Sequence, residues 1–236
     1  MNSRFPSLAL AVVLALAGCA TRPASTTATA PAVSADPVIN VVASVAAPEP
    51  GPLLLRKGDR LALCGDSITE QRMYSRIIET YLTACTPQLD ISVRQYGWSG
   101  ERADGFHQRM KNDVLRFQPT VATTCYGMND HQYRAYEPAI GEYYRTNMLA
   151  VVRTFKNAGV RVVLGSPGCV GKVPAWVKGA GPTVEALNIN LAQLRNIDIA
   201  MARQEGVAFA DIFKPMYAAG TVARDVYGPD YAVPGA

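Results

Sequence analysis

Three short segments of the sequence combine glycine with side chains that serve nucleophilic catalysis, and each directly follows an apolar run. Ser67 lies in the first segment, Gly100 in the second and Asn129 in the third. A serine hydroxyl becomes a nucleophile when a base accepts its proton. Its attack on a carbonyl creates an oxyanion, which backbone N–H groups and an asparagine amide can stabilise. The segments, residues 65–70, 97–101 and 126–131, therefore predict acyl transfer through Ser67.

The apolar runs before these segments have the length and composition of buried strands. We expect strands at residues 60–64, 91–96, 120–126, 161–166 and 207–210. Near-continuous apolar character is typical of parallel strands that are covered on both faces. Because the carboxyl ends of parallel strands form the ligand site of such sheets, the three segments should converge.

Amphipathic helices are expected between the strands. Apolar residues at helical spacing form three stripes, and the second and third end at Gly159 and Gly206. Strands that alternate with helices predict a three-layer α/β/α sandwich with a central parallel five-stranded sheet. The stripes are Ile77, Ile78, Tyr81 and Leu82; Ile140, Tyr144, Met148, Val151, Val152 and Phe155; and Val184, Leu187, Leu191, Leu194 and Met201.

The three segments, in this order, resemble the conserved blocks of the SGNH hydrolases, also called the GDSL family. The first block matches Gly65-Asp66-Ser67, and the third matches 127–130 without gaps. The resemblance implies a flavodoxin-like fold from about residue 60 onward and Ser67 as nucleophile. It also implies an oxyanion hole formed by Ser67, Gly100 and Asn129. Taken alone, Ser67 also fits a helix N-cap with Glu70 three residues later.

Two aspartates next to these residues have a structural interpretation. Asp66 and Asp130 are expected to hold their loops through hydrogen bonds from the backbone.

The resemblance also implies a fourth block, Asp-x-x-His, which supplies the base, and residues 1–236 do not contain it. The histidines are His107 and His131, and Asp230 is followed three positions later by Val233. We expect the block to lie beyond Ala236; the alternatives are that it has been lost, or that His131 serves instead. Because residues 225–236 read as a loop, we expect domain 53–236 to lack its last helix.

The first residues are typical of an export signal. Arg4 precedes a short apolar run, and Leu16-Ala17-Gly18-Cys19 resembles the lipobox at which bacterial lipoproteins are cut and acylated. Residues 1–18 are then a signal peptide, and Cys19 carries the lipid that attaches the protein to a membrane. An ordinary signal peptide is the alternative. Residues 19–52, rich in Ala, Thr and Pro, are expected to form a flexible tether.

The composition of the chain narrows the possible classes of function. The net charge of +4 is spread along the chain without a basic run, so nucleic-acid binding gets no support. There is no C-x-x-C or Cys/His cluster, and neither a metal nor another cofactor is expected. Of the cysteines that could pair after export, Cys64 and Cys125 lie in predicted buried strands and read as free thiols. The oligomeric state stays open.

Two functions of different classes fit these observations. The first is an exported ester hydrolase that forms an acyl-Ser67 intermediate and acts on short acyl, mainly acetyl, esters of carbohydrates. The second is a catalytically inactive esterase-like lipoprotein that binds cell-surface or plant glycans. We expect an outer-membrane or cell-envelope location, with a periplasmic or secreted protein as the alternative.

Overall fold

Five short apolar segments of the chain form one parallel sheet in the order β2-β1-β3-β4-β5. All five fall within the segments predicted from the sequence, apart from differences of a residue at their ends. The strands are β1 (Arg60–Gly65), β2 (Ser92–Gly97), β3 (Val121–Cys125), β4 (Arg161–Gly165) and β5 (Ala208–Ala210). The computed structural model describes residues 34–52, 54–178, 181–228 and 230–231, all within the second of two units, Val33–Ala236.

The strand register brings the predicted catalytic loops to one edge of the sheet. Gly65 at the end of β1 pairs with Gly97 of β2 and with Cys125 of β3. The chain leaves β1 toward β2 on one side, while β3 lies on the other. In sheets with this strand order, the crevice between the two directions holds the ligand. The loops after β1, β2 and β3 therefore meet there.

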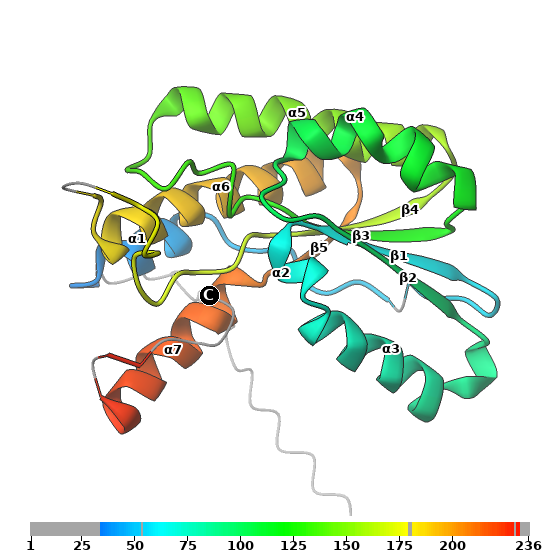
Figure 1. Cartoon of the computed structure of the whole chain (residues 1–236), viewed down its shortest axis with the longest axis horizontal. Coiled ribbons are helices and arrows are strands. Elements are labelled where there is room, and N and C mark those ends of the chain that lie inside the picture. Colours follow the sequence, from blue (N-terminus) through cyan, green and yellow to red (C-terminus); the bar gives the residue numbers. More distant parts are fainter. Residues whose placement is uncertain (1–33, 53, 179–180, 229, 232–236) are drawn as a thin grey trace, which may run out of the picture. The chain divides into compact units, whose positions relative to one another are not determined.

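Helices cover both faces of the sheet, as predicted (Figure 1). One face carries α4, α5 and α6, and the other carries α3 and α7. The short helix α2 follows β1 directly. The helices have these bounds: α2 (Ser67–Glu70), α3 (Met73–Cys85), α4 (Ala103–Asp113), α5 (Pro138–Asn157), α6 (Val184–Glu205) and α7 (Phe213–Tyr227).

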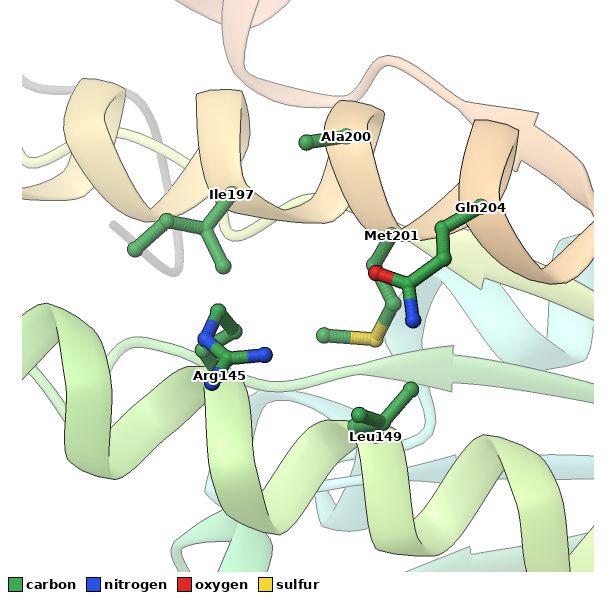
Figure 2. A pocket seen from close by; sticks show the side chains of 6 residues that line it. All are labelled: Arg145, Leu149, Ile197, Ala200, Met201 and Gln204. Atoms are coloured by element: carbon green, nitrogen blue, oxygen red, sulfur yellow. The ribbon is translucent and has the colours of Figure 1, made fainter.

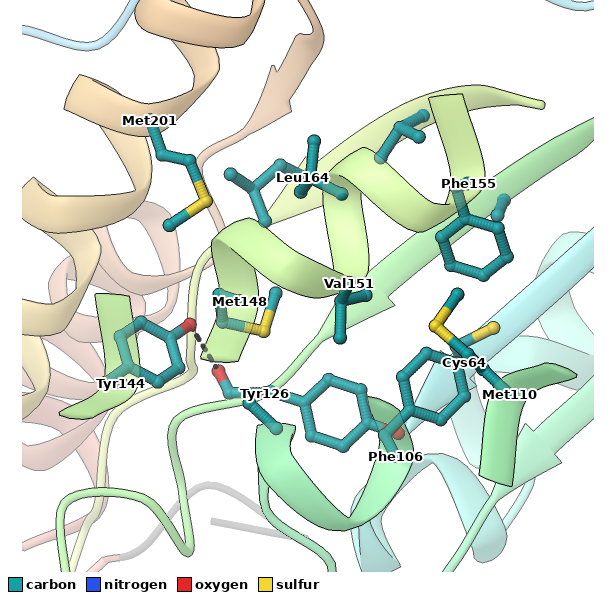
Figure 3. Close-up of a cluster of buried hydrophobic side chains, with 14 of the residues drawn as sticks. Cys64, Phe106, Met110, Tyr126, Tyr144, Met148, Val151, Phe155, Leu164 and Met201 are labelled. Atoms are coloured by element: carbon teal, nitrogen blue, oxygen red, sulfur yellow. Dashed lines mark hydrogen bonds between the residues drawn. The ribbon is translucent and has the colours of Figure 1, made fainter. Parts of the chain in front are cut away.

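The main core lies between the sheet and the helices α4, α5 and α6. All six apolar residues of the predicted α5 stripe are buried in it. Phe106 of α4 packs against Tyr126, with ring centroids 5.2 Å apart, and against Phe155 of α5 (Figure 3). Tyr144 donates a 3.4 Å hydrogen bond to the carbonyl of Tyr126. These contacts of Tyr126 fix the loop after β3 to the core.

The predicted stripe on α3 is only half right. Ile78 and Leu82 pack toward the sheet, whereas Ile77 and Tyr81 are 71% and 58% exposed. Neighbouring helical residues point about 100° apart, and a helix buries pairs at i and i+4. The four residues form two such pairs, so a helix that buries one pair on a single neighbour leaves the other at the surface.

The prediction of a flexible tether for residues 19–52 is wrong for its last part. Residues Pro37–Ser44 form helix α1, with Asp36 as N-cap and Pro37 in the first turn. Val38 is buried, and Val41 and Val42 pack on the same cluster, which is the i, i+3, i+4 spacing of an amphipathic helix. The buried cluster gives this segment the apolar contacts that offset its ordering entropy.

Side chains of α6 fasten the carboxyl end of α1. Arg195 donates hydrogen bonds of 3.1 Å to the carbonyls of Val42 and Val45, and it pairs with Asp211 at 2.6 Å. The last carbonyls of a helix lack hydrogen-bond partners within it. The bonds from Arg195 supply partners for two carbonyls at the end of α1.

At the other end of the chain, residues 225–227 belong to α7, so their prediction as a loop is wrong. The predicted signal peptide and Cys19 lie outside the described residues. Within the described residues, no helix is both long and apolar enough to cross a membrane.

Candidate active site

Ser67 lies where β1 turns into α2. It is the first residue of the helix and is half-buried. Asp66 caps the helix, and its carboxylate accepts a 3.0 Å hydrogen bond from the N–H of Ile68. Burial raises the pKa of Asp66 to about 6. The prediction that Asp66 holds its loop is confirmed, and capping by Asp66 leaves the Ser67 hydroxyl free for chemistry.

Glycines let the second loop approach the first. A side chain on Gly97 would collide with the backbone of Glu70, so α2 lies against the end of β2 as closely as a backbone allows. Gly100 has a φ of +71°, a left-handed conformation that glycine adopts without steric cost. No atom lies within 4 Å of the position that its Cβ would take, so the site is open there.

Asp130 ties the second loop to the third. It is buried, and its two carboxylate oxygens accept hydrogen bonds of 3.0 Å from the N–H groups of Ala103 and Gly127. Burial raises the pKa of Asp130 to about 6, against the lowering effect of these two bonds. The structural role predicted for Asp130 is confirmed.

All three loops also meet at Glu101, a residue that the sequence did not single out. Tyr126 donates its hydroxyl hydrogen to the Glu101 carboxylate at 2.7 Å, and the same hydroxyl oxygen lies 3.3 Å from the carbonyl oxygen of Gly65. Arg109 binds the same carboxylate through two bonds of 2.6 and 2.7 Å. Paired hydrogen bonds between guanidinium and carboxylate are strong and directional. This network holds the segments that carry Ser67, Gly100 and Asn129 in one geometry.

The side-chain amide of Asn129 is held at both of its ends. Its Nδ2 donates a 3.0 Å hydrogen bond to the carbonyl of Glu101, and its Oδ1 accepts one of 3.0 Å from the hydroxyl of Tyr133. An amide nitrogen carries two hydrogens. The second N–H is therefore left to donate to an oxyanion, as the resemblance implies for this residue.

The backbone after Asn129 is strained in a way that brings Tyr133 back to it. Gln132 and Tyr133 have φ values of 55° and 52°, in the left-handed region that residues with side chains rarely adopt. Strain of this kind persists where the surroundings enforce it and is common at functional sites.

His131 does not act as a partner of Ser67 in this structure. Its ring is fully buried, and its Nδ1 hydrogen-bonds to the carbonyl of Met128. Burial lowers the pKa of His131 to about 4. The other histidine, His107, lies near Thr154, with 3.3 Å between Nε2 and the hydroxyl. Among the described residues, Ser67 therefore has no histidine as a base.

No group of metal-ligating side chains occurs among the residues that the structure describes. Cys64, Cys85, Cys125 and Cys169 are free thiols, and burial raises the pKa of Cys125 to about 12. A small cavity of about 90 Å³ lies between α5 and α6 and includes no residue of the three loops (Figure 2). Its lining consists of Arg145, Leu149, Ile197, Ala200, Met201 and Gln204.

The sheet order and the three converging loops define a three-layer α/β/α fold like that of the SGNH hydrolases. The GDSL-like lipase/acylhydrolase family matches residues 63–233, which is more than half of the chain. The protein belongs to this family, whose members include ester hydrolases.

Solved structures with the same fold include several esterases. Axe2, an acetyl-xylooligosaccharide esterase from Geobacillus stearothermophilus, matches with a TM-score of 0.59 and 18% identity, over 73% of this chain and 83% of that one. An acetyl xylan esterase, AlAXEase, matches with a TM-score of 0.58 and 20% identity, over 71% and 84%. A search of curated proteins gives no match.

A longer protein shares the fold as well. The gut microbial diltiazem-metabolizing enzyme BT4096 matches with a TM-score of 0.63 and 24% identity, over 75% of this chain. The match spans only 41% of the length of that enzyme. Structural similarity at these levels of sequence identity shows only that the fold is shared.

Proposed function

We propose that this protein hydrolyses carboxylic esters through an acyl-Ser67 intermediate. The observation that carries the proposal is the amide of Asn129, held at both ends with one N–H left over, on a loop joined to those of Ser67 and Gly100. Preorganised donors of this kind stabilise the charge that develops in acyl transfer, and loss of one typically costs about 10²–10³ in turnover.

Each residue has a defined part in the proposed reaction. The oxygen of Ser67 attacks the ester carbonyl while a base takes its proton, and the carbonyl oxygen becomes an oxyanion. The N–H groups of Ser67 and Gly100 and the amide of Asn129 donate to that oxyanion. It then collapses and expels the alcohol, which takes up the proton. Water repeats the sequence on the acyl-serine and releases the acid.

Acetyl esters of carbohydrates are the substrate class that we propose. Two enzymes with the same fold are described as an acetyl-xylooligosaccharide esterase and an acetyl xylan esterase. Ser67 lies at the carboxyl edge of the sheet and is half-buried. Hydrolysis of acetylated xylotriose, measured as released acetate, tests the substrate class. Turnover of simple aryl acetates but not of any acetylated oligosaccharide would refute it.

The proposed reaction also needs a base that takes the proton of Ser67. Axe2 structures in which a serine, an aspartate or a histidine is replaced by alanine are described as catalytic mutants. We propose that an Asp-x-x-His block supplies the base here as well, and that residues 1–236 alone turn over esters slowly. Imidazole added to residues 1–236 should speed the hydrolysis of p-nitrophenyl acetate beyond the rate seen with Ser67→Ala.

A binding protein without catalysis is the second candidate. It is favoured by one observation, that Ser67 has no histidine partner among the described residues. Glycan binding with no ester turnover in the chain extended to the stop codon of its gene would support this candidate over the hydrolase.

We also propose that acyl groups on Cys19 attach the protein to the cell envelope, and that the membrane is an outer membrane. Ala20 follows the cysteine, and the resemblance to lipoproteins associates an aspartate at that position with retention at the inner membrane. Attachment by lipid requires no spanning helix.

A further inference from the structure

The two tryptophans of the chain both lie in loops that follow the carboxyl ends of strands. Trp98 follows β2 and is 60% exposed, and Trp176 lies between β4 and α6 and is 67% exposed. Tryptophan is highly buried on average. Contiguous apolar surface that remains exposed beside a site commonly marks where a ligand binds.

Trp176 is connected to the oxyanion residue through a single side chain. Its ring meets the ring of Tyr133 edge-to-face, with centroids 5.8 Å apart and planes at 80°. Tyr133 in turn donates its hydroxyl hydrogen bond to Asn129. An edge-to-face contact occupies only part of an indole, so most of the Trp176 ring stays available to a ligand beside Asn129.

Apolar packing fixes the loop of Trp176 on the same side as Ser67. Val173, three residues before Trp176, packs on the apolar cluster that also contacts Tyr133 and Ile68, the neighbour of Ser67. The ring of Tyr133 is itself supported by His131, at 4.7 Å between centroids. The aromatic surface next to the oxyanion residue is therefore built on buried structure.

The charges beside Trp176 indicate the chemistry of the ligand. Between residues 171 and 178 the charged side chains are Lys172 and Lys178, both exposed. A lysine ammonium offers three hydrogen-bond donors. A sugar ring has apolar C–H faces that suit an indole and hydroxyl groups that suit these donors. A long acyl chain could not accept hydrogen bonds from the two lysines, and it would remain exposed to water.

We infer that Trp176 and Tyr133 form a subsite for a pyranose ring of the alcohol part of the substrate. The inference rests on the proposed function, since it names where the carbohydrate of the ester lies while its acyl group faces Asn129. Binding of the sugar part does not require the base, so the subsite is open to measurement independently of catalysis.

The experiment uses the full 236-residue chain with Trp98→Phe, which leaves Trp176 as the sole tryptophan. Its fluorescence is titrated with xylotriose, cellotriose and chitotriose, which lack the ester. We expect a saturable change with at least one of them. Calorimetry with that sugar, in the same Trp98→Phe background, should show binding about tenfold weaker or worse for Trp176→Ala. Because Trp176 is exposed, circular dichroism should show the same fold in each variant.

Absence of any saturable change, or equal affinity of Trp176→Ala and the parent protein, would overturn the subsite. The proposed hydrolysis would survive that result if Ser67 still cleaves p-nitrophenyl acetate. Conversely, sugar binding that depends on Trp176, without ester cleavage by the chain extended to its stop codon, would keep the subsite and refute the hydrolase.

Discussion

The hydroxyl of Tyr133 donates a 3.0 Å hydrogen bond to Oδ1 of Asn129, four residues earlier in the chain. The carbonyl of Glu101 can only accept, so it fixes the nitrogen of the Asn129 amide on its side. The bond from Tyr133 holds the amide oxygen at the other end. The bond depends on two consecutive left-handed residues, which cost on the order of 1 kcal/mol each.

Tyr133→Phe should therefore lower kcat while leaving KM nearly unchanged. The variant keeps the ring that packs on His131 and loses only the bond that orients the amide, so we expect a loss of about tenfold. In the Asn129→Ala background the same change should have no further effect. Steady-state kinetics of the four proteins with p-nitrophenyl acetate measure this, and additive losses would argue that Tyr133 acts elsewhere.

Asn129→Ala should lower kcat by about two to three orders of magnitude with little change in KM, because its amide interacts mainly with the developing charge. The same assay, with the full product of the gene, measures the effect. A rise in KM at constant kcat would show that Asn129 binds substrate rather than the oxyanion.

His131 should make the protein sensitive to acid. Its pKa is about 4 when folded and 6.5 in the reference state, so the unfolded chain binds more protons between these values. Stability is then fully present above pH 6.5 and is lost as the pH falls toward 4, by on the order of 3 kcal/mol. Urea unfolding of wild type and His131→Phe between pH 4 and 7 should show that wild type loses stability relative to the variant as the pH falls from 6.5 toward 4.

Buried carboxyl groups act in the opposite direction in the same pH range, among them Asp198, whose pKa burial raises well above its usual value. The pKa values of Asp66 and Asp130 are raised to about 6, so their contribution to stability falls as the pH rises from about 4 to 6. They are present in both proteins, and the difference between wild type and variant isolates His131. Tyr133→Phe, which keeps His131, serves as the matched control and should keep the wild-type slope.

Cys19→Ala should move the protein from the membrane fraction to the soluble periplasmic or secreted fraction. Two or more acyl chains are needed for stable attachment, and the variant would carry none at this position. Fractionation of cells expressing either form, followed by immunoblotting, measures the change. Equal soluble amounts of both forms would favour an ordinary signal peptide.

The convergence of the loops that carry Ser67, Gly100 and Asn129 could be predicted because it depends on a simple rule. Parallel strands buried on both faces have a strong apolar signal, and their carboxyl ends meet at one edge. The role of Glu101 could not be predicted, because its partners Arg109 and Tyr126 lie 8 and 25 residues away and reach it only in the folded chain.

Helix α1 was missed for a different reason. Its start signals, Asp36 followed by Pro37, were present in the sequence, but the helix has few residues and no charged face. Short helices depend on tertiary contacts for their stability. The hydrogen bonds from Arg195 and the apolar cluster around Val38 supply those contacts, and neither is visible before α6 is placed.

The most direct test is to locate the acyl group itself. The full product of the gene is mixed with p-nitrophenyl acetate, quenched in acid, digested and analysed by mass spectrometry. The account predicts one acetyl group on the peptide that contains Ser67, and neither acetyl group nor turnover in Ser67→Ala. Undiminished turnover in Ser67→Ala, or an acetyl group on a different peptide that forms at the rate of turnover, would contradict it.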